Sequence, residues 1–147
     1  MKKIILFIGT RPEAIKMLPL AIELKKIKSN KIIICSTGQH KEILNSVFKV
    51  FEIKPDINLN LFDISIDYDT LLTNIYSSVS KIFKKLKPDL AVVHGDTANS
   101  MICALSAFNH KIKIAHVEAG LRSKNNKSPW PEEVYRKMIS NMSDFHF

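Results

Sequence analysis

The sequence is poor in glycine, cysteine and long apolar runs, and each shortage excludes a class of protein. Only four of its 147 residues are glycines, and the turn GTRPEAIK after the first apolar run holds only one, unlike the glycine-rich loops of Walker or dinucleotide-binding proteins. The two cysteines, Cys35 and Cys103, lie far apart in apolar surroundings, which predicts reduced, buried thiols in a cytoplasmic protein. No run approaches the roughly 20 apolar residues that cross a bilayer, so we expect no contact with a membrane.

Arginine is also scarce, although the chain is basic. Of 22 basic residues 19 are lysines, and against 14 acidic residues they give a formal net charge of +8. The lysines are scattered over predicted helix surfaces and loops and are not interleaved with aromatic residues, which favours a solvated face over a nucleic-acid surface. Arg11, Arg122 and Arg136 each lie near a turn after an apolar run or near an acidic cluster. We expect the functional site there.

Apolar runs alternate with amphipathic segments along the whole chain. The predicted strands are residues 3–9, 31–38, 57–62, 89–96 and 111–120. The predicted helices are residues 12–27, 41–51, 68–87, 97–109 and 132–142. This order predicts an α/β fold, a Rossmann-like parallel sheet with helices on both faces. A further apolar strand begins within residues 143–147, so we expect one domain, residues 1–147, that stops before its last elements.

Helical spacing also predicts which side chains enter the core. In the first helix the residues expected to face inward are Ala14, Ile15, Leu18, Ala21, Ile22 and Leu24. In the second helix they are Ile43, Leu44, Val47 and Phe48.

The turns after the predicted strands hold most of the candidate functional residues. In a parallel sheet these turns share one edge, where open α/β folds bind their ligands. The turns are Gly9-Thr10-Arg11, Thr37-Gly38-Gln39-His40, Gly95-Asp96-Thr97 and Glu118-Ala119-Gly120. We therefore expect one crevice lined by all four.

The first of these turns, GTRPEAIK, combines helix-start signals with two cations. Thr10 and Glu13 have the spacing of a capping box, and Pro12 suits a first helical turn. Arg11 and Lys16 lie near the positive end of that helix, where a bound anion such as phosphate would offset their charge. The alternative is that Glu13 neutralises both cations at the surface.

Three other turns bring one carboxylate each towards the same edge, namely Asp96, Glu118 and Glu132. Carboxylates in different surroundings can divide the roles of acid and base. No Cys/His spacing indicates a metal site and no serine or cysteine motif indicates a nucleophile, while His40, His94 and His116 are expected to pack or to form hydrogen bonds. The structural alternatives are helix capping by Asp96 or Thr97, an ion pair between Glu118 and Arg122, and a helical salt bridge between Glu132 and Arg136.

The segments GTRPEAIK, TGQH, HGDT, HVEAGLRS and SPWPEEVYR, in this order and spacing, resemble the non-hydrolysing UDP-N-acetylglucosamine 2-epimerase family. The resemblance implies the first domain of a glycosyltransferase-B-like fold, in which two Rossmann-like domains close on UDP-GlcNAc. It implies elimination of UDP from C1 with loss of the C2 proton, giving 2-acetamidoglucal. UDP then adds back to form UDP-ManNAc, and neither a metal nor a redox cofactor is required.

The resemblance also implies roles for individual residues. The matched carboxylates, implied to be catalytic, are Asp96, Glu118 and Glu132. The basic residues implied to bind the substrate are Arg11, Lys16 and Arg136. The segment implied to bind a second UDP-GlcNAc as an allosteric activator is Gln39 and His40. Glu42 and Ser65 stand where many members have glutamine and arginine, which leaves allosteric activation open.

Family members are more than twice as long, and their second domain supplies most contacts to UDP. We therefore predict that this chain lacks the second UDP-binding domain, is inactive alone, and belongs to a protein that is a homodimer when complete. Three alternatives remain: an epimerase of a modified UDP-amino sugar, another two-domain glycosyltransferase, and a non-catalytic module that binds a nucleotide sugar.

Overall fold

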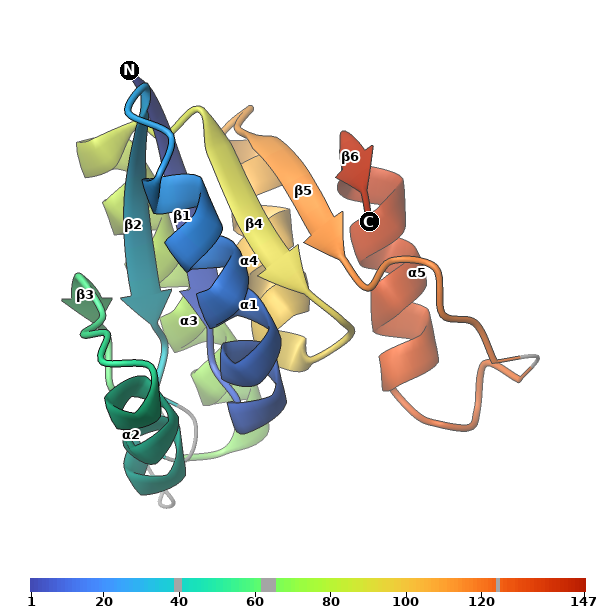
Figure 1. The fold of residues 1–147 in the computed structure, drawn as a ribbon. Coiled ribbons are helices and arrows are strands. Elements are labelled where there is room, and N and C mark those ends of the chain that lie inside the picture. Colours follow the sequence, from blue (N-terminus) through green and yellow to red (C-terminus); the bar gives the residue numbers. More distant parts are fainter. Residues whose placement is uncertain (39–40, 62–65, 124) are drawn as a thin grey trace.

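The computed structural model describes residues 1–38, 41–61, 66–123 and 125–147, and for residues 41–43 it describes the backbone alone. The strands form one parallel sheet in the order β3-β2-β1-β4-β5-β6 (Figure 1). They are β1 (Lys2–Ile8), β2 (Asn30–Ser36), β3 (Ile57–Asn58), β4 (Leu90–His94), β5 (Lys113–Val117) and β6 (Phe145–His146). The helices are α1 (Arg11–Lys25), α2 (Lys41–Val50), α3 (Tyr68–Leu86), α4 (Ala98–Asn109) and α5 (Glu132–Met142). Within the described ranges, none of these helices is long and apolar enough to cross a membrane.

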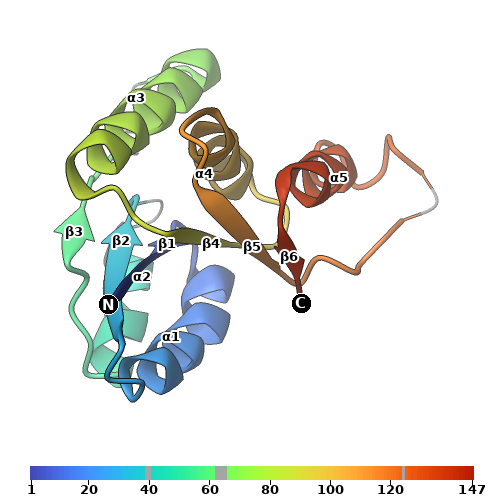
Figure 2. The ribbon, with the colours of Figure 1, turned by 90° about the horizontal axis from the view of Figure 1, so that it is seen from above.

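Helices cover both faces of the sheet. Figure 2 shows α1 and α2 against one face and α3, α4 and α5 against the other. The chain runs outward from β1 to β3, returns through α3 to β4 on the other side of β1, and continues outward to β6. Right-handed crossovers in opposite directions place helices on opposite faces, and the carboxyl ends of β1 and β4 meet where the direction changes. The predicted α/β, Rossmann-like parallel fold is confirmed.

Polar side chains cap three of the helices. In α1 the Thr10 hydroxyl accepts the Glu13 N–H at 3.4 Å, and the Glu13 carboxylate accepts the Thr10 N–H at 3.0 Å. The predicted capping box is therefore confirmed. Asp67 caps α3, and Thr97 caps α4, as one of the structural alternatives expected.

The prediction for the inner face of α1 is partly wrong. Ile15 and Ile22 are 46% and 36% exposed rather than buried. The buried positions recur at intervals of three and four residues, and each isoleucine lies one residue further on, about 100° around the helix. The buried apolar residues of α1 are Ala14, Met17, Leu18 and Ala21. In α2, Leu44, Val47 and Phe48 are buried as predicted, whereas the side chain of Ile43 lies outside the described residues.

The strands β2 to β5 are shorter than predicted, and β3 and β5 are shortened the most. β3 ends at Asn58, and Asn60 has the left-handed φ of 47°, which breaks the extended backbone. β5 begins only at Lys113 because the Ile112 N–H still bonds to the Ala107 carbonyl at the end of α4. β5 ends at Val117, and Glu118 again has a left-handed φ, of 63°.

At the amino ends of β3, β4 and β6, three aspartates join each strand to its neighbour. Asp56, Asp89 and Asp144 each precede a strand and are exposed. Each carboxylate accepts a backbone N–H of the adjacent strand at 2.8 Å, and each aspartate N–H donates to the carbonyl of the same partner at 2.9 Å. The partners, in that order, are Ile34, Lys3 and Ile114. Each of these carboxylates therefore helps to fix the register between its own strand and the adjacent one.

Candidate active site

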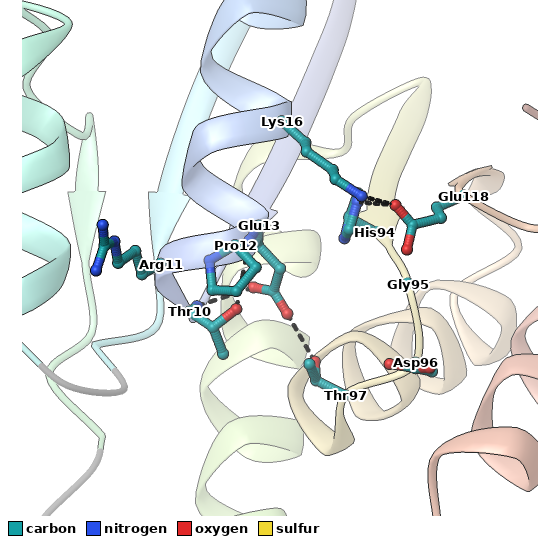
Figure 3. A pocket seen from close by; sticks show the side chains of 10 residues that line it. All are labelled: Thr10, Arg11, Pro12, Glu13, Lys16, His94, Gly95, Asp96, Thr97 and Glu118. Atoms are coloured by element: carbon teal, nitrogen blue, oxygen red, sulfur yellow. Dashed lines mark hydrogen bonds and ion pairs between the residues drawn. The ribbon is translucent and has the colours of Figure 1, made fainter. Parts of the chain in front are cut away.

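A cavity of about 470 Å³ lies at the carboxyl ends of β1, β4 and β5 (Figure 3). The turn from β1 into α1 forms one side, and the turn from β4 into α4 together with Glu118 after β5 forms the other. The lining residues are Thr10, Arg11, Pro12, Glu13, Lys16, His94, Gly95, Asp96, Thr97 and Glu118. The predicted crevice thus exists for three of the four turns, whereas Gln39 and His40 of the remaining turn lie outside the described residues.

Glu118 is held by two basic side chains. Lys16 forms an ion pair and hydrogen bond with Glu118 Oε2, and His94 Nε2 lies 3.3 Å from the same oxygen. The bond from Lys16 lowers the pKa of Glu118, which favours the ionised carboxylate. Burial lowers the pKa of His94, which favours a neutral imidazole. Sequence reasoning offered Arg122 as the partner of Glu118, and this was wrong.

The reason lies in the backbone around Glu118. Its left-handed φ of 63° turns the chain sharply after β5, a conformation that is uncommon outside glycine. Arg122 instead donates to the carbonyl groups of Ala119 and Leu121, both at 2.6 Å. The cavity is thus lined by the carboxylate of Glu118, while the guanidinium of Arg122, four residues later in the chain, bonds to the backbone instead.

Asp96 lies on the same side of the cavity and pairs with α5. Arg136, which is 8% exposed, forms an ion pair with Asp96 Oδ2, and its Nη1 lies 3.9 Å from Glu133. The expected helical salt bridge between Glu132 and Arg136 is not among the ion pairs of the described residues. Arg136 reaches across to the β4–α4 turn because its side chain faces inward from α5, whose buried residues include Glu133, Arg136 and Ile139.

Glu132 lines a second hollow of about 360 Å³ rather than the first cavity. The two hollows share Thr10, Asp96 and Thr97. Glu132 Oε2 is buried without a hydrogen-bond partner in the described part of the chain. In the same hollow the hydroxyl groups of Tyr68 and Tyr135 are 2.9 Å apart, and burial, together with this bond, raises the pKa of Tyr68. Asp96 thus connects the surroundings of Glu118 with those of Glu132.

The anion at the start of α1 is the protein's own carboxylate. Glu13 is 1% exposed and accepts the N–H groups of Gly9 and Thr10, so these donors are not available to an external phosphate. Glu13 also forms no ion pair with Arg11 or Lys16 among the described residues, so it does not neutralise them at the surface as the alternative supposed. Figure 3 shows Arg11 on the other side of the first turn of α1 from Lys16 and Glu118.

His116 supports the site from behind. It is fully buried in β5, and its Nε2 lies 2.6 Å from the Gly95 carbonyl while Nδ1 lies 3.2 Å from the Ser140 hydroxyl. Nε2 therefore carries the proton and donates it to Gly95, next to Asp96. Burial lowers the pKa of His116, in keeping with a neutral ring. This agrees with the hydrogen-bonding role expected for it.

Two contacts of the site were not predicted from the sequence. One is the contact of His94 with Glu118, and the other is the bond of the second Glu13 oxygen, Oε1, with Thr97. The only signal for Glu13 was the Thr-x-x-Glu pattern, which predicts a helix cap and nothing further. The side chain of Glu42 and all of Ser65 lie outside the described residues. Within those residues, no group of three or more His, Cys, Asp or Glu side chains is arranged to hold a metal ion.

Comparison with known proteins places the site in a family. A family model described as UDP-N-acetylglucosamine 2-epimerase matches residues 22–147. The UDP-N-acetylglucosamine 2-epimerase of Neisseria meningitidis is 44% identical over 145 residues, which are 99% of this chain and 39% of that relative. The enzyme of the same name from Bacillus subtilis is 43% identical over 99% of this chain and 38% of its own length.

A solved structure agrees with these relatives. The crystal structure of UDP-GlcNAc 2-epimerase from Neisseria meningitidis bound to UDP-GlcNAc is 45% identical, with a TM-score of 0.93 over all of this chain and 39% of that chain. The predicted glycosyltransferase-B-like fold class is confirmed by this likeness. This chain corresponds to the N-terminal part of these proteins and spans about two fifths of the length of the curated relatives it matches. The chain therefore belongs to the UDP-N-acetylglucosamine 2-epimerase family.

Proposed function

We propose that this chain is the N-terminal part of a non-hydrolysing epimerase that interconverts UDP-GlcNAc and UDP-ManNAc. The observation that carries the proposal is the cavity between the β1–α1 and β4–α4 turns, which the Lys16–Glu118 pair bridges and which Asp96 also lines. A solved family member that covers all of this chain was crystallised with UDP-GlcNAc. Both the place and the charges of the cavity suit a nucleotide sugar.

The chemistry explains why cations and carboxylates are needed together. The C2 proton of UDP-GlcNAc has no adjacent carbonyl, so departure of the pyrophosphate from C1 must supply much of the activation. Arg11 and Lys16 are suited to stabilise the charge that develops on the departing UDP. An ionised carboxylate can accept the C2 proton, and a second carboxylate must return a proton on the opposite face.

The three carboxylates differ in ways that suit such a division. Glu118 is kept ionised by Lys16, and Asp96 is paired with Arg136. Glu132, in contrast, has a buried oxygen without a hydrogen-bond partner in the described part of the chain. We propose all three as catalytic residues and Arg11, Lys16 and Arg136 as the basic residues of the substrate site. Gln39 and His40 belong to the proposal as allosteric residues.

The proposal includes the rest of the protein. The chain corresponds to 39% of the Neisseria relative, so we propose that a second domain supplies the opposite wall and most contacts to UDP. The complete protein would then be a cytoplasmic homodimer, and analytical ultracentrifugation can test its dimeric state. The isolated chain is expected to be inactive.

Deuterium incorporation at C2 of UDP-GlcNAc in heavy water tests the function. The assay compares the isolated chain with a reassembled enzyme, in which this chain is co-expressed with the part of the Neisseria meningitidis relative that lies outside the match. We expect incorporation and UDP-ManNAc only in the reassembled enzyme. Incorporation by the isolated chain would overturn the requirement for a second domain. Binding of UDP-GlcNAc without turnover in either sample would instead indicate a non-catalytic module.

A further inference from the structure

Glu13 occupies an unusual position for a helix-capping residue. Its side chain is 1% exposed, and Oε2 accepts the N–H groups of Gly9 at 2.5 Å and Thr10 at 3.0 Å. These two bonds hold the β1–α1 turn and complete the cap of α1. A cap of this kind normally lies at the surface and leaves its other oxygen in water.

The other oxygen of Glu13 bonds to a different turn. Oε1 accepts the Thr97 hydroxyl at 2.7 Å and lies 3.3 Å from the Ser100 hydroxyl, which donates at 2.7 Å to the His94 carbonyl. Thr97 is also the N-cap of α4 and directly follows Asp96. One carboxylate therefore joins the two turns that form opposite sides of the cavity (Figure 3).

Glu13 is held by hydrogen bonds and has no basic partner among the described residues. Backbone N–H groups only donate, so Oε2 must accept from both Gly9 and Thr10. Burial raises the pKa of Glu13, but these bonds and the Thr97 hydroxyl favour the ionised form. Glu13 lies in the first turn of α1 and contacts the N-cap of α4, so the positive ends of two helices face it. No cation pairs with it among the described residues.

We propose that Glu13 is a positioning residue that locks the β1–α1 turn to the β4–α4 turn and so sets the placement of Asp96 relative to Lys16. The link between the turns stands on the hydrogen bonds alone, whereas its effect on catalysis rests on the proposed function. A residue that merely capped α1 would hold Gly9 and Thr10 but would leave Asp96 and Thr97 unaffected.

Amide chemical shifts of the isolated chain test the link from both sides. Glu13→Gln keeps the size of the side chain but places an N–H₂ group where one of its two acceptors was, and Thr97→Val removes the hydroxyl that reaches Glu13. We expect Glu13→Gln to shift the amide signals of Asp96 and Thr97, and Thr97→Val to shift those of Gly9 and Thr10. Asp89→Ala is the matched control, since it removes a carboxylate that accepts a backbone N–H at the other end of the sheet.

The outcomes separate the inference from the proposed function. If neither variant shifts the signals of the opposite turn beyond the Asp89→Ala control, the link does not exist. In the reassembled enzyme we expect Glu13→Ala to lower kcat about 100-fold with a much smaller change in KM, and Glu13→Gln to recover part of the loss. An unchanged kcat per folded molecule would reduce Glu13 to a structural residue. An inactive wild-type enzyme would count against the proposed function, and the amide signals would still decide the link.

Discussion

Carboxylates at the two ends of the strands have different roles. At the amino ends of β3, β4 and β6, Asp56, Asp89 and Asp144 are exposed and bond to the backbone of a neighbouring strand. At the carboxyl end, Glu118 and Asp96 pair with cations from other elements and line a cavity. The first arrangement satisfies backbone donors, whereas the second brings charged side chains together and leaves them accessible to a ligand. Glu118 and Asp96 thus form direct hydrogen bonds with cationic side chains, whereas the ion pair of Asp89 with the exposed Lys2 is longer, at 3.6 Å.

The largest expected difference between the two ends is in catalysis. In the reassembled enzyme, Asp96→Asn or Glu118→Gln should lower the rate of UDP-ManNAc formation about 100- to 10,000-fold, because each variant removes a group that exchanges protons with the substrate. Asp89→Asn should leave the rate unchanged. Full activity in Asp96→Asn would remove Asp96 from the proposed catalytic residues.

The second difference concerns stability. Arg136→Met should destabilise the chain by about 3 kcal/mol, since it leaves the partly buried carboxylate of Asp96 without its partner. The double variant Arg136→Met/Asp96→Asn should recover much of this loss. The measurement is urea unfolding followed by circular dichroism, and a double variant no more stable than Arg136→Met would show that the pair itself is not the cause.

The third prediction measures how tightly the carboxyl end is packed. A Cβ atom on Gly9 would lie 2.7 Å from both Asn99 Nδ2 and Thr37 Oγ1, whereas one on Gly120 meets nothing within 4 Å. Gly9→Ala should therefore lower the free energy of unfolding by about 1 to 3 kcal/mol, and Gly120→Ala should change it little. Equal stability of the two variants would show that the turn relaxes around the added methyl group.

The smallest expected difference is in pH dependence. Burial lowers the pKa of His94 below its ordinary 6.5. The unfolded chain therefore binds this proton more readily than the folded chain. The contribution of neutral His94 to stability is fully present above pH 6.5 and is lost as the pH falls through the folded pKa. The bond from the Lys3 N–H lowers the pKa of Asp89 below 3.8, so its contribution is lost only as pH falls below that value. Thermal melts from pH 7.5 to 3 should show a smaller loss near pH 6 in His94→Gln and a smaller loss near pH 3.5 in Asp89→Asn. The same acid profile in all three proteins would contradict both assignments.

Local patterns predicted much of the fold. The strand and helix order was predictable because buried strands and amphipathic helices have different periods, and the Thr10–Glu13 cap because its spacing is local. The inward face of α1 was predicted less well. Ile15 and Ile22 are apolar and were expected inside, but packing against the sheet rotates α1 about its axis so that both side chains are exposed. The partners of Glu118 and Arg136 were predicted from neighbours in sequence, and both pairings differ in the structure.

The sequence by itself determined a parallel α/β sheet and the edge at which the charged turns gather, because both follow from local periodicity and the handedness of crossovers. Only the tertiary structure decided which charges meet. Lys16 pairs with Glu118 across 102 positions and Arg136 with Asp96 across 40, while Glu13 joins two turns 84 positions apart. Such contacts depend on the reversal of strand order beside β1 and on the rotation of α1 and α5 about their axes, and neither is encoded in the spacing of neighbouring residues.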